Sequence, residues 1–380
     1  MSKRILIFST AYLPFIGGAE VAVKEITDRL GNDFEFVMIT PRLDPALPAE
    51  EKIGAIQVHR LGSGKSFDKY RLIWEGPKKA TKLGSFDAVW GIMASYAGFA
   101  ARRYKKQNPA VPFLLTLQEG DSTWHIYKHV WWCWRYFKQI FTSADRIQVI
   151  STYLKNWAVT LGAKNLISVV PNGVGLEHFY VPTAAAREQA SSEVRAEIGI
   201  PFDAKIIFTA SRLVAKNGVG DLIKSLPLLP FSVHLVIAGT GELETSLREL
   251  AKRQEVVERV HFLGSKMHAE LPRYLWGSTL FCRPSLSEGL GNSFLEAMAA
   301  GTPVIATPVG GILDFLTDGV TGWFCKVKNP KSIAEKVLLL LREENKAEIA
   351  RVTQNAQKLI VEKYSWETVA LQMKSLFETL

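Results

Sequence analysis

The segment SEGLGNSFLEAMAAGTP spans residues 287–303 and directly follows the apolar run Leu280–Pro284. The apolar run has the length and composition of a buried β-strand. Gly289 and Gly291 allow a tight turn after this strand, and the helix that follows is expected to end at Gly301 and Pro303. A strand, a glycine-rich turn and a helix in this order predict an α/β sheet whose ligand site lies at the carboxyl end of the strand.

The same order of elements recurs along both halves of the chain. Short apolar runs alternate with amphipathic stretches of helical length, such as Ala19–Leu30 and Tyr96–Gln107. The expected strands are Arg4–Ser9, Phe34–Thr40, Ile56–Leu61, Phe86–Gly91, Pro112–Leu117, Arg146–Ser151, Ile167–Val170, Lys205–Ala210, His234–Ala238, Val260–Leu263, Leu280–Pro284 and Pro303–Thr307. Runs that are apolar on both faces are typical of parallel sheets covered by helices on both sides. The sequence therefore predicts two doubly wound, Rossmann-like α/β domains.

A polar, alanine-rich stretch near residues 173–200 contains no strand candidate and predicts the domain boundary. The first domain is expected over residues 1–182 and the second over 183–363. Residues 364–380 carry apolar side chains at helical spacing, including Trp366, Met373 and Phe377, and predict an amphipathic terminal helix.

Composition excludes several classes of protein. A hydrophobic content of 47% with 22% charged residues is that of a globular chain, not a disordered one. No apolar run approaches the roughly 20 residues of a membrane-spanning helix, and the apolar start of the chain is too brief for a secretory signal. Cys133, Cys282 and Cys325 share no metal-like spacing, so they are expected to be reduced thiols of a cytoplasmic protein.

Two glutamates, Glu288 and Glu296, lie before and after the glycine turn at residues 289–291. Glu288 could accept hydrogen bonds from sugar hydroxyls, and the sequence shows no structural role for it. Glu296 could accept both hydroxyls of a ribose, but Ser293-x-x-Glu296 is equally the pattern of a capping box that only completes the helix start. Backbone N–H groups from Asn292 to Leu295 would be free there, and they predict a diphosphate site that needs no metal ion.

Two further turns carry candidate ligand residues. In FTASRLVAKNGV (208–219), Arg212 could bind phosphate oxygens in a bidentate manner, and Lys216 adds a second charge. Together they could neutralise a departing diphosphate, whereas the alternative is a structural arginine and a solvated lysine. Gly17 and Gly18 follow the first strand and allow close approach of a ligand, although many such turns use paired glycines for geometry alone.

With these residues the chain resembles family 4 of the retaining glycosyltransferases over nearly its whole length. The resemblance rests on GGAE (17–20), PNGV (171–174), SRL with a following Lys and Gly (211–218), AGTGE (238–242) and, above all, Glu288-x7-Glu296. It implies the GT-B fold, with two domains facing across a cleft and a terminal helix that crosses back to the first domain. It also implies transfer of a sugar from UDP or GDP to a hydroxyl of a glycan or lipid-linked acceptor, with retained anomeric configuration and no metal or other cofactor.

The resemblance assigns roles to individual residues. Glu296 would bind the ribose, Glu288 would lie near the reacting sugar, Arg212 would bind the diphosphate, and Glu242 would border the base. The residues expected to bind the donor are Gly17, Gly18, Arg212, Lys216, Asn217, Gly241, Glu242, Glu288, Gly289, Leu290, Gly291, Asn292, Ser293 and Glu296. Those expected to act in catalysis are Glu288, Arg212, Lys216, Gln118 and Glu119.

Two positions depart from the family pattern. Asn217 stands where the family usually has its phosphate-binding lysine, with Lys216 one place earlier. Gln118 stands where a histidine commonly contacts the donor sugar; it can donate a hydrogen bond but cannot transfer a proton. In the front-face displacement described for the family, the leaving phosphate takes the acceptor's proton, which leaves Glu119 and Asp121 to orient the acceptor hydroxyl.

The net charge of +9 is concentrated in the first half, where residues 1–182 hold 23 Lys and Arg against 15 Asp and Glu. Residues 124–138, WHIYKHVWWCWRYFK, combine aromatic and basic side chains. They form either a helix packed within the first domain or an interfacial patch. The resulting hypothesis is that the first domain docks on the anionic inner face of the cytoplasmic membrane to reach a lipid-linked acceptor.

Three other functions remain open from the sequence. A sugar epimerase or hydrolase of the same fold would release nucleotide diphosphate without an acceptor. A phosphorylase would need a lysine that binds pyridoxal phosphate, and nothing in the sequence indicates such a lysine. The basic half could also belong to a non-enzymatic binding protein. Its basic residues are scattered and match no nucleic-acid reader module, so no nucleic-acid partner is expected.

Overall fold

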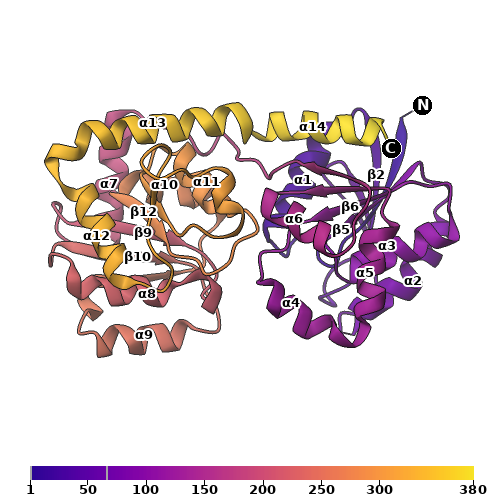
Figure 1. Cartoon of the computed structure of the whole chain (residues 1–380), viewed down its shortest axis with the longest axis horizontal. Coiled ribbons are helices and arrows are strands. Elements are labelled where there is room, and N and C mark those ends of the chain that lie inside the picture. Colours follow the sequence, from indigo (N-terminus) through magenta and orange to yellow (C-terminus); the bar gives the residue numbers. More distant parts are fainter. Residues whose placement is uncertain (1, 66) are drawn as a thin grey trace. The chain divides into compact units, whose positions relative to one another are not determined.

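The computed structural model describes residues 2–65 and 67–380 and divides the chain into two compact units (Figure 1). Unit 1 comprises Met1–Gly173 with Trp366–Leu380, and unit 2 comprises Val174–Ser365. The expected boundary after residue 182 therefore lies inside unit 2. Residues 174–182 belong there because their apolar side chains pack on it: Phe179 is fully buried, and the Tyr180 ring lies 5.0 Å from that of Trp276.

Unit 1 is built on an eight-stranded sheet with the order β3-β4-β2-β1-β5-β6-β7-β8. All its neighbouring strands are parallel except β3, which pairs antiparallel with β4 at the edge. The strands are β1 (Lys3–Phe8), β2 (Phe34–Pro41), β3 (Glu50–Ile53), β4 (Ile56–Leu61), β5 (Ala88–Ile92), β6 (Phe113–Leu117), β7 (Arg146–Val149) and β8 (Leu166–Val169). The helices are α1 (Gly18–Leu30), α2 (Asp68–Lys82), α3 (Tyr96–Gln107), α4 (Thr123–Val130), α5 (Trp134–Ser143), α6 (Thr152–Thr160) and α14 (Trp366–Glu378), with the short 3-10 helix η1 (Trp131–Cys133).

Unit 2 contains a six-stranded parallel sheet with the order β11-β10-β9-β12-β13-β14. Its strands are β9 (Lys205–Ala210), β10 (Val233–Ala238), β11 (Val260–Gly264), β12 (Leu280–Arg283), β13 (Val304–Ala306) and β14 (Trp323–Phe324). Its helices are α7 (Ala184–Ile198), α8 (Val219–Ser225), α9 (Glu244–Arg253), α10 (Leu271–Gly277), α11 (Asn292–Ala299), α12 (Pro330–Leu341) and α13 (Lys346–Lys363). This strand order is that of a doubly wound Rossmann fold, and it reverses between β9 and β12.

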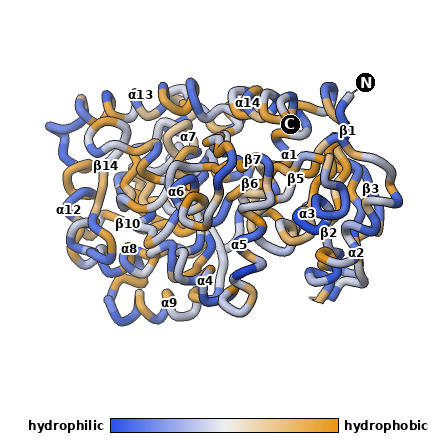
Figure 2. Tube along the Cα trace, turned by 45° about the vertical axis from the view of Figure 1, so that its right-hand side comes forward, coloured by the Kyte–Doolittle hydropathy of each residue, from blue (hydrophilic) through white to orange (hydrophobic). Residues whose placement is uncertain are grey.

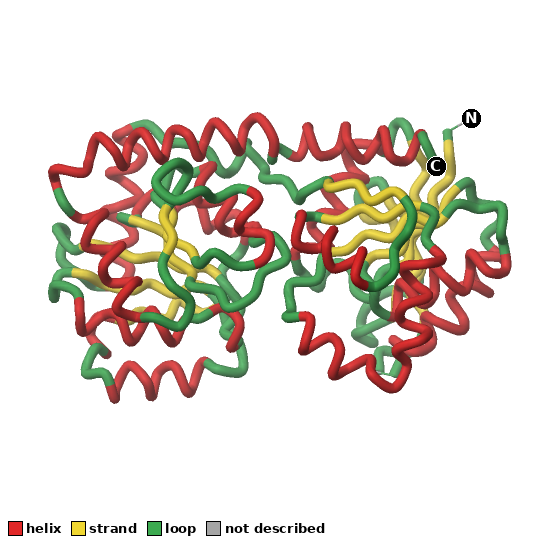
Figure 3. Tube along the Cα trace, in the orientation of Figure 1, coloured by secondary structure: helices red, strands yellow, loops and turns green. Residues whose placement is uncertain are grey.

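Both sheets are covered by helices, as Figure 3 shows for each unit. Strands β5, β6 and β10 contain only buried residues, so both of their faces are covered. In Figure 2, hydrophobic segments gather along the unit 1 strands near β1 and β2, while α13 alternates between hydrophobic and hydrophilic turns. The predicted class of fold, two doubly wound α/β domains, is therefore confirmed.

Two strands escaped the sequence analysis. β3 has the sequence EEKI, and its side chains alternate between exposed and half-buried. An edge strand with one solvated face lacks the apolar run on which the prediction relied. β14 contains only two residues, which is too short for any periodicity to be recognised.

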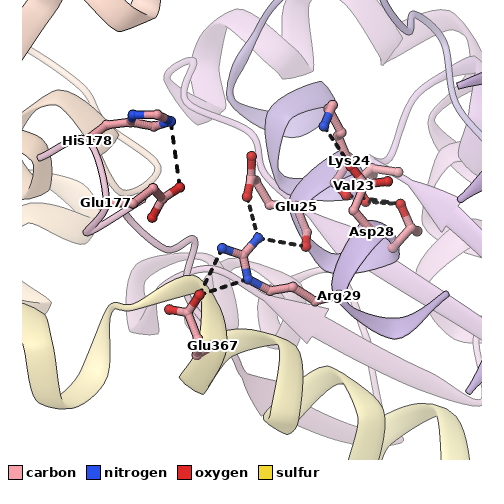
Figure 4. A network of polar contacts seen from close by, with 9 residues as sticks. Val23, Lys24, Glu25, Asp28, Arg29, Glu177, His178 and Glu367 are labelled. Carbon is pink, nitrogen blue, oxygen red and sulfur yellow. Dashed lines mark hydrogen bonds and ion pairs between the residues drawn. The ribbon is translucent and has the colours of Figure 1, made fainter. Parts of the chain in front are cut away.

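Helix α14 packs on unit 1, which confirms the expected return of the chain to the first domain. Its apolar face is buried with the core that includes β1 and β2, and the Phe377 ring lies 5.4 Å from that of Phe34. Figure 4 shows Arg29 of α1 between Glu25 and Glu367 of α14. Arg29 Nη2 donates to Glu367 Oε1 over 2.9 Å, which adds a polar anchor at the start of the terminal helix.

Candidate functional site

A pocket of about 240 Å³ lies at the carboxyl ends of the unit 2 strands. Its walls come from the residues that follow β9, β10 and β11 and from the start of α11. The lining residues are Ala210, Ser211, Arg212, Ala238, Gly239, Thr240, Ser265, Lys266, Leu271 and Ser293. The pocket spans the reversal between β9 and β12, where open α/β sheets bind their ligands. Arg212 and Ser293 are the expected donor residues that line it.

The turn between β9 and α8 holds Arg212 by its backbone. The Asn217 side chain donates to the carbonyl oxygen of Arg212 over 2.7 Å, and Leu213 N donates to Thr240 O over 2.9 Å. Asn217 is buried, so its amide supports the turn, while the side chain of Arg212 is exposed. The structure therefore gives Asn217 a supporting contact and leaves the guanidinium of Arg212 accessible at the pocket.

The glycines around this pocket permit close packing of its loops. Gly239 has φ +136°, and a Cβ there would lie 1.9 Å from Ser211 O. Only glycine fits this position, because both the conformation and the space exclude a side chain. Gly241 and Glu242 follow in the same loop and are both exposed, and they do not line the pocket.

Helix α11 begins at Asn292, and Gly291 at its N-cap has a left-handed conformation with φ +99°. Ser293 does not cap the helix: its hydroxyl accepts from Arg283 Nη1 over 2.7 Å. Phe294 N already donates to Gly291 O, so one of the N–H groups expected to be free is used within the turn. The preceding residues, Gly289 and Leu290, are buried.

Glu288 forms a buried ion pair that the sequence analysis did not foresee. Arg283 Nη2 donates to Glu288 Oε1 over 2.7 Å, and the Ser285 hydroxyl donates to the same oxygen over 3.1 Å. The side chains of Arg283 and Glu288 are only 8% and 10% exposed. The expectation that Glu288 has no structural role is therefore wrong, because a buried carboxylate requires such a partner.

Glu296 lies beside a histidine instead of completing a capping box. His268 Nε2 and Glu296 Oε1 are 3.0 Å apart, and no side-chain cap bond is formed at the start of α11 within the described residues. The His268 ring also lies 4.9 Å from the ring of the buried Phe179. The structure thus contradicts the capping alternative, and it places the Glu296 carboxylate where His268 can orient it.

The candidate residues of unit 1 lie at the carboxyl end of its own sheet. Gln118 and Glu119 directly follow β6, and the side-chain oxygen Oε1 of Gln118 accepts from Asn172 Nδ2 over 3.0 Å. Asn172 belongs to the PNGV motif, so the fold brings two of the motifs together. Gly17 and Gly18 follow β1 and are exposed at the start of α1. Gly17 has φ −139°, a conformation open to any residue, so its backbone does not demand glycine.

Glu119 is a buried carboxyl group with one satisfied oxygen. Ala94 N donates to its Oε1 over 2.6 Å, and Oε2 has no hydrogen-bond partner among the described residues. Burial raises the pKa of Glu119 to about 7, partly offset by backbone N–H donors. The nearby Asp121 raises this pKa further. A carboxyl group with this pKa changes charge near neutral pH, as acid and base groups of active sites do.

Comparison with known proteins identifies the chain. Residues 191–359 match the family described as Glycosyl transferases group 1, and residues 16–178 match Glycosyltransferase Family 4. The chain belongs to the GT-B glycosyltransferases. An uncharacterized glycosyltransferase of Methanocaldococcus jannaschii is 26% identical over 377 residues, which cover 99% of this chain and 98% of the relative.

A functionally named relative and a solved structure extend the comparison. A mannosyltransferase of Corynebacterium glutamicum, named as GDP-mannose-dependent and acting on monoacylated alpha-(1-6)-phosphatidylinositol monomannoside, is 28% identical over 64% of each chain. The crystal structure of Anabaena HepE in complex with UDP-glucose aligns with this chain over the full length of both proteins, with a TM-score of 0.83 and 18% identity. At this identity the likeness to HepE concerns the fold.

Four residues of this glycosyltransferase's site were missed in the sequence. Arg283 and His268 contact the two predicted glutamates, and Ser265 and Lys266 line the pocket after β11. The last two could have been found, because they follow a predicted strand as Arg212 does. Arg283 and His268 could not, since their partners are set by packing. Within the described residues, no group of three or more His, Cys, Asp and Glu side chains is arranged to hold a metal ion.

The buried Glu119 predicts a pH dependence of stability in this glycosyltransferase. The pKa of Glu119 in the folded protein is about 7, above its ordinary value of 4.5. The protonated carboxyl therefore contributes its full share of the free energy of unfolding below about pH 4.5, and this contribution is lost as the pH rises through 7. At about 1.4 kcal/mol per pKa unit the loss is about 3 kcal/mol. Glu119→Gln cannot ionise, so its free energy of unfolding should fall about 2–3 kcal/mol less than the wild type's between pH 5 and pH 8.

Urea unfolding at the two pH values measures this difference. Glu188→Gln changes an exposed carboxylate and serves as the control, which should follow the wild type. If Glu119→Gln also follows the wild type across this range, Glu119 is ionised in the folded protein and the prediction fails.

Proposed function

We propose that this glycosyltransferase moves a hexosyl group from a UDP- or GDP-linked sugar to a hydroxyl of a glycan or lipid-linked acceptor. The observation that carries the donor assignment is the pocket at the β9/β12 reversal, with the accessible Arg212 on one side and the start of α11 on the other. A guanidinium and a helix N-terminus both stabilise a diphosphate. HepE binds UDP-glucose and the Corynebacterium relative uses GDP-mannose, which supports a nucleotide-sugar donor of either kind.

In this proposal the unit 2 residues bind and activate the donor. Arg212 and Lys216 neutralise the charge that develops on the departing diphosphate, so no metal ion is required. Glu296, oriented by His268, accepts the ribose hydroxyls. Glu288 reaches the transferred sugar while Arg283 holds its carboxylate in place. The base lies toward the loops after β10 and β11, bordered by Glu242.

The unit 1 residues orient the acceptor. Gln118 and Glu119 follow β6, and the Glu119 carboxyl can accept or donate a hydrogen bond near neutral pH. The acceptor's proton passes to the leaving phosphate on the same face of the sugar, which gives retention of configuration. The named substrate of the Corynebacterium relative is a lipid glycoside, which supports a role in cell-envelope polysaccharide synthesis at the inner face of the membrane.

A thermal-shift screen with UDP, GDP, ADP and their sugars tests the donor, because a ligand that binds the folded state raises the melting temperature. Product analysis with candidate acceptors, repeated in EDTA, then tests the reaction. Glycoside formation that persists in EDTA and keeps the donor's anomeric configuration supports the proposal. Nucleotide diphosphate released equally fast without any acceptor would instead indicate an epimerase or hydrolase, and loss of turnover in EDTA would refute metal independence.

Glu296→Ala is expected to weaken nucleotide binding about 10- to 100-fold, because a hydrogen bond to a charged acceptor contributes about 1.5–3 kcal/mol. Isothermal titration with UDP and GDP measures the affinity, and the 2′-deoxy nucleotide should lose less on substitution than the ribonucleotide. Glu249→Ala removes an exposed carboxylate of α9 and is the matched control. Unchanged affinity for every nucleotide diphosphate would remove Glu296 from the donor site.

A further inference from the structure

Unit 1 exposes a concentration of large aromatic side chains on α4, η1 and α5. Trp124, Trp131, Trp132 and Tyr136 are 76%, 75%, 69% and 60% exposed. None of the eight residues of α4 is buried. Single exposed apolar residues are ordinary on a protein surface, but a group of this size marks an interaction site.

The opposite sides of these helices anchor them to unit 1. Phe137, Ile140 and Phe141 of α5 are fully buried, and Trp157 Nε1 donates to the hydroxyl of Tyr127 in α4 over 3.2 Å. Helix α5 is therefore packed within the first domain, as one of the two alternatives expected, while the exposed aromatic residues lie outside the core. Helix α5 is amphipathic, with its aromatic and basic outer face directed to solvent.

A further exposed tryptophan lies on α2, which is linked to α5 through helix α3. Helix α3 packs against both α2 and α5. Trp74 of α2 is 57% exposed, and the guanidinium of Arg103 in α3 lies 4.2 Å from the centre of its ring. We call the set Trp74, Arg103, Trp124, Lys128, Trp131, Trp132, Arg135 and Tyr136 the aromatic–basic surface.

The charge of this surface selects its partner. Residues 122–144 contain Lys128, Arg135 and Lys138 but no Asp or Glu. Cations attract anionic phospholipids, and Trp and Tyr favour the headgroup region of a bilayer because one end of each ring is apolar and the other polar. No helix in the described part of the chain is long and apolar enough to cross a membrane, so binding through this surface would be peripheral.

We propose that the aromatic–basic surface docks unit 1 onto a membrane that contains anionic phospholipid. The inference rests on the proposed function and deepens it, because an enzyme with a lipid-linked acceptor must reach that acceptor at a bilayer. The tryptophans enter the interface and Lys128, Arg135 and Arg103 contact lipid phosphates. Exposed side chains that are costly to leave in water thereby gain a partner of matching polarity and charge.

Flotation with vesicles of phosphatidylcholine, with and without phosphatidylglycerol, tests this surface in the full chain. The wild type should float with the anionic vesicles only, and raising salt from about 0.1 M to about 1 M should release it. The triple variant Trp124→Ser/Trp131→Ser/Trp132→Ser should lower vesicle binding at least about tenfold, given the free energy of burying large apolar side chains. Lys128→Gln/Arg135→Gln should lose the preference for anionic lipid.

Matched controls come from unit 2. Phe202→Ser removes an aromatic side chain that is 67% exposed, and Lys331→Gln removes an exposed cation. Both should bind vesicles as the wild type does. Brominated lipid provides a measurement that needs no variant: it should quench part of the wild-type tryptophan fluorescence, and absence of quenching would overturn the proposal.

Other occupants give different results. A wild-type dimer that the triple substitution converts to a monomer in light scattering, without flotation, would assign the surface to a second copy of the chain and overturn the proposal. Nucleotide binding is measured in parallel. Normal nucleotide affinity without flotation refutes only the membrane surface, whereas flotation without affinity for any nucleotide refutes only the proposed donor site.

Discussion

Glu288→Ala is expected to lower the free energy of unfolding by about 3–5 kcal/mol, because it leaves the guanidinium of Arg283 buried without its carboxylate. In a unit of this size the loss corresponds to a fall of roughly 10 °C in the melting temperature. Differential scanning calorimetry measures this fall. The expected effect is far larger than that of an ordinary substitution, because both partners of the pair are buried.

Two further variants separate the ion pair from other effects of the substitution. Arg283→Met/Glu288→Leu removes both charges and should recover much of the stability that Glu288→Ala loses, since no unpaired charge remains. Glu242→Ala removes an exposed glutamate and should change stability by at most about 0.5 kcal/mol. A Glu288→Ala protein that melts with the wild type would show that the pair contributes nothing to the fold.

Arg212→Ala is expected to lower kcat about 10²- to 10³-fold while leaving the fold intact. The activity loss follows from removing a positive charge aimed at the departing diphosphate, for which single-donor deletions have effects of this size. The fold should survive because Asn217 and Leu213 hold the turn through backbone groups and the Arg212 side chain is exposed. Initial rates over a range of donor concentrations separate kcat from KM.

The contribution of the planar guanidinium geometry to activity can be tested separately from the contribution of the charge. Arg212→Lys keeps the charge but loses the planar fork, so its activity should lie between that of Arg212→Ala and the wild type. Arg253→Ala removes an exposed arginine from α9 and should retain full activity. Near-normal turnover of a folded Arg212→Ala protein would exclude this residue from the mechanism.

The sequence predicted the sheets because their strands carry the information locally. Strands β9, β10, β12 and β13 are largely buried and mostly apolar, and a short apolar run of this kind can be recognised from the sequence alone. The same local logic placed Arg212 and the start of α11 at the ends of neighbouring strands. It failed at β3, an edge strand that pairs with β4 but contains no apolar run by which the sequence could reveal it.

The contacts of the site residues could not be predicted from the sequence. The capping pattern at Ser293 and Glu296 was present in the sequence, but Arg283 captured the serine hydroxyl and His268 approached the glutamate. A local capping motif competes with every other donor that the fold brings near, and here a charged guanidinium takes the place of a backbone N–H. The competition cannot be judged before the neighbours are known.

By itself the sequence determined two α/β domains, the glycine turn before α11 and the identity of the groups at the strand ends. These features depend on side-chain periodicity and backbone conformation over a few residues. The tertiary structure alone decided that Glu288 is paired with Arg283, that Glu119 is buried near Ala94, and that Arg103 of α3 lies over the ring of Trp74 in α2. Such features depend on burial and on contacts between segments distant in the chain, which only the packing of the finished sheets and helices creates.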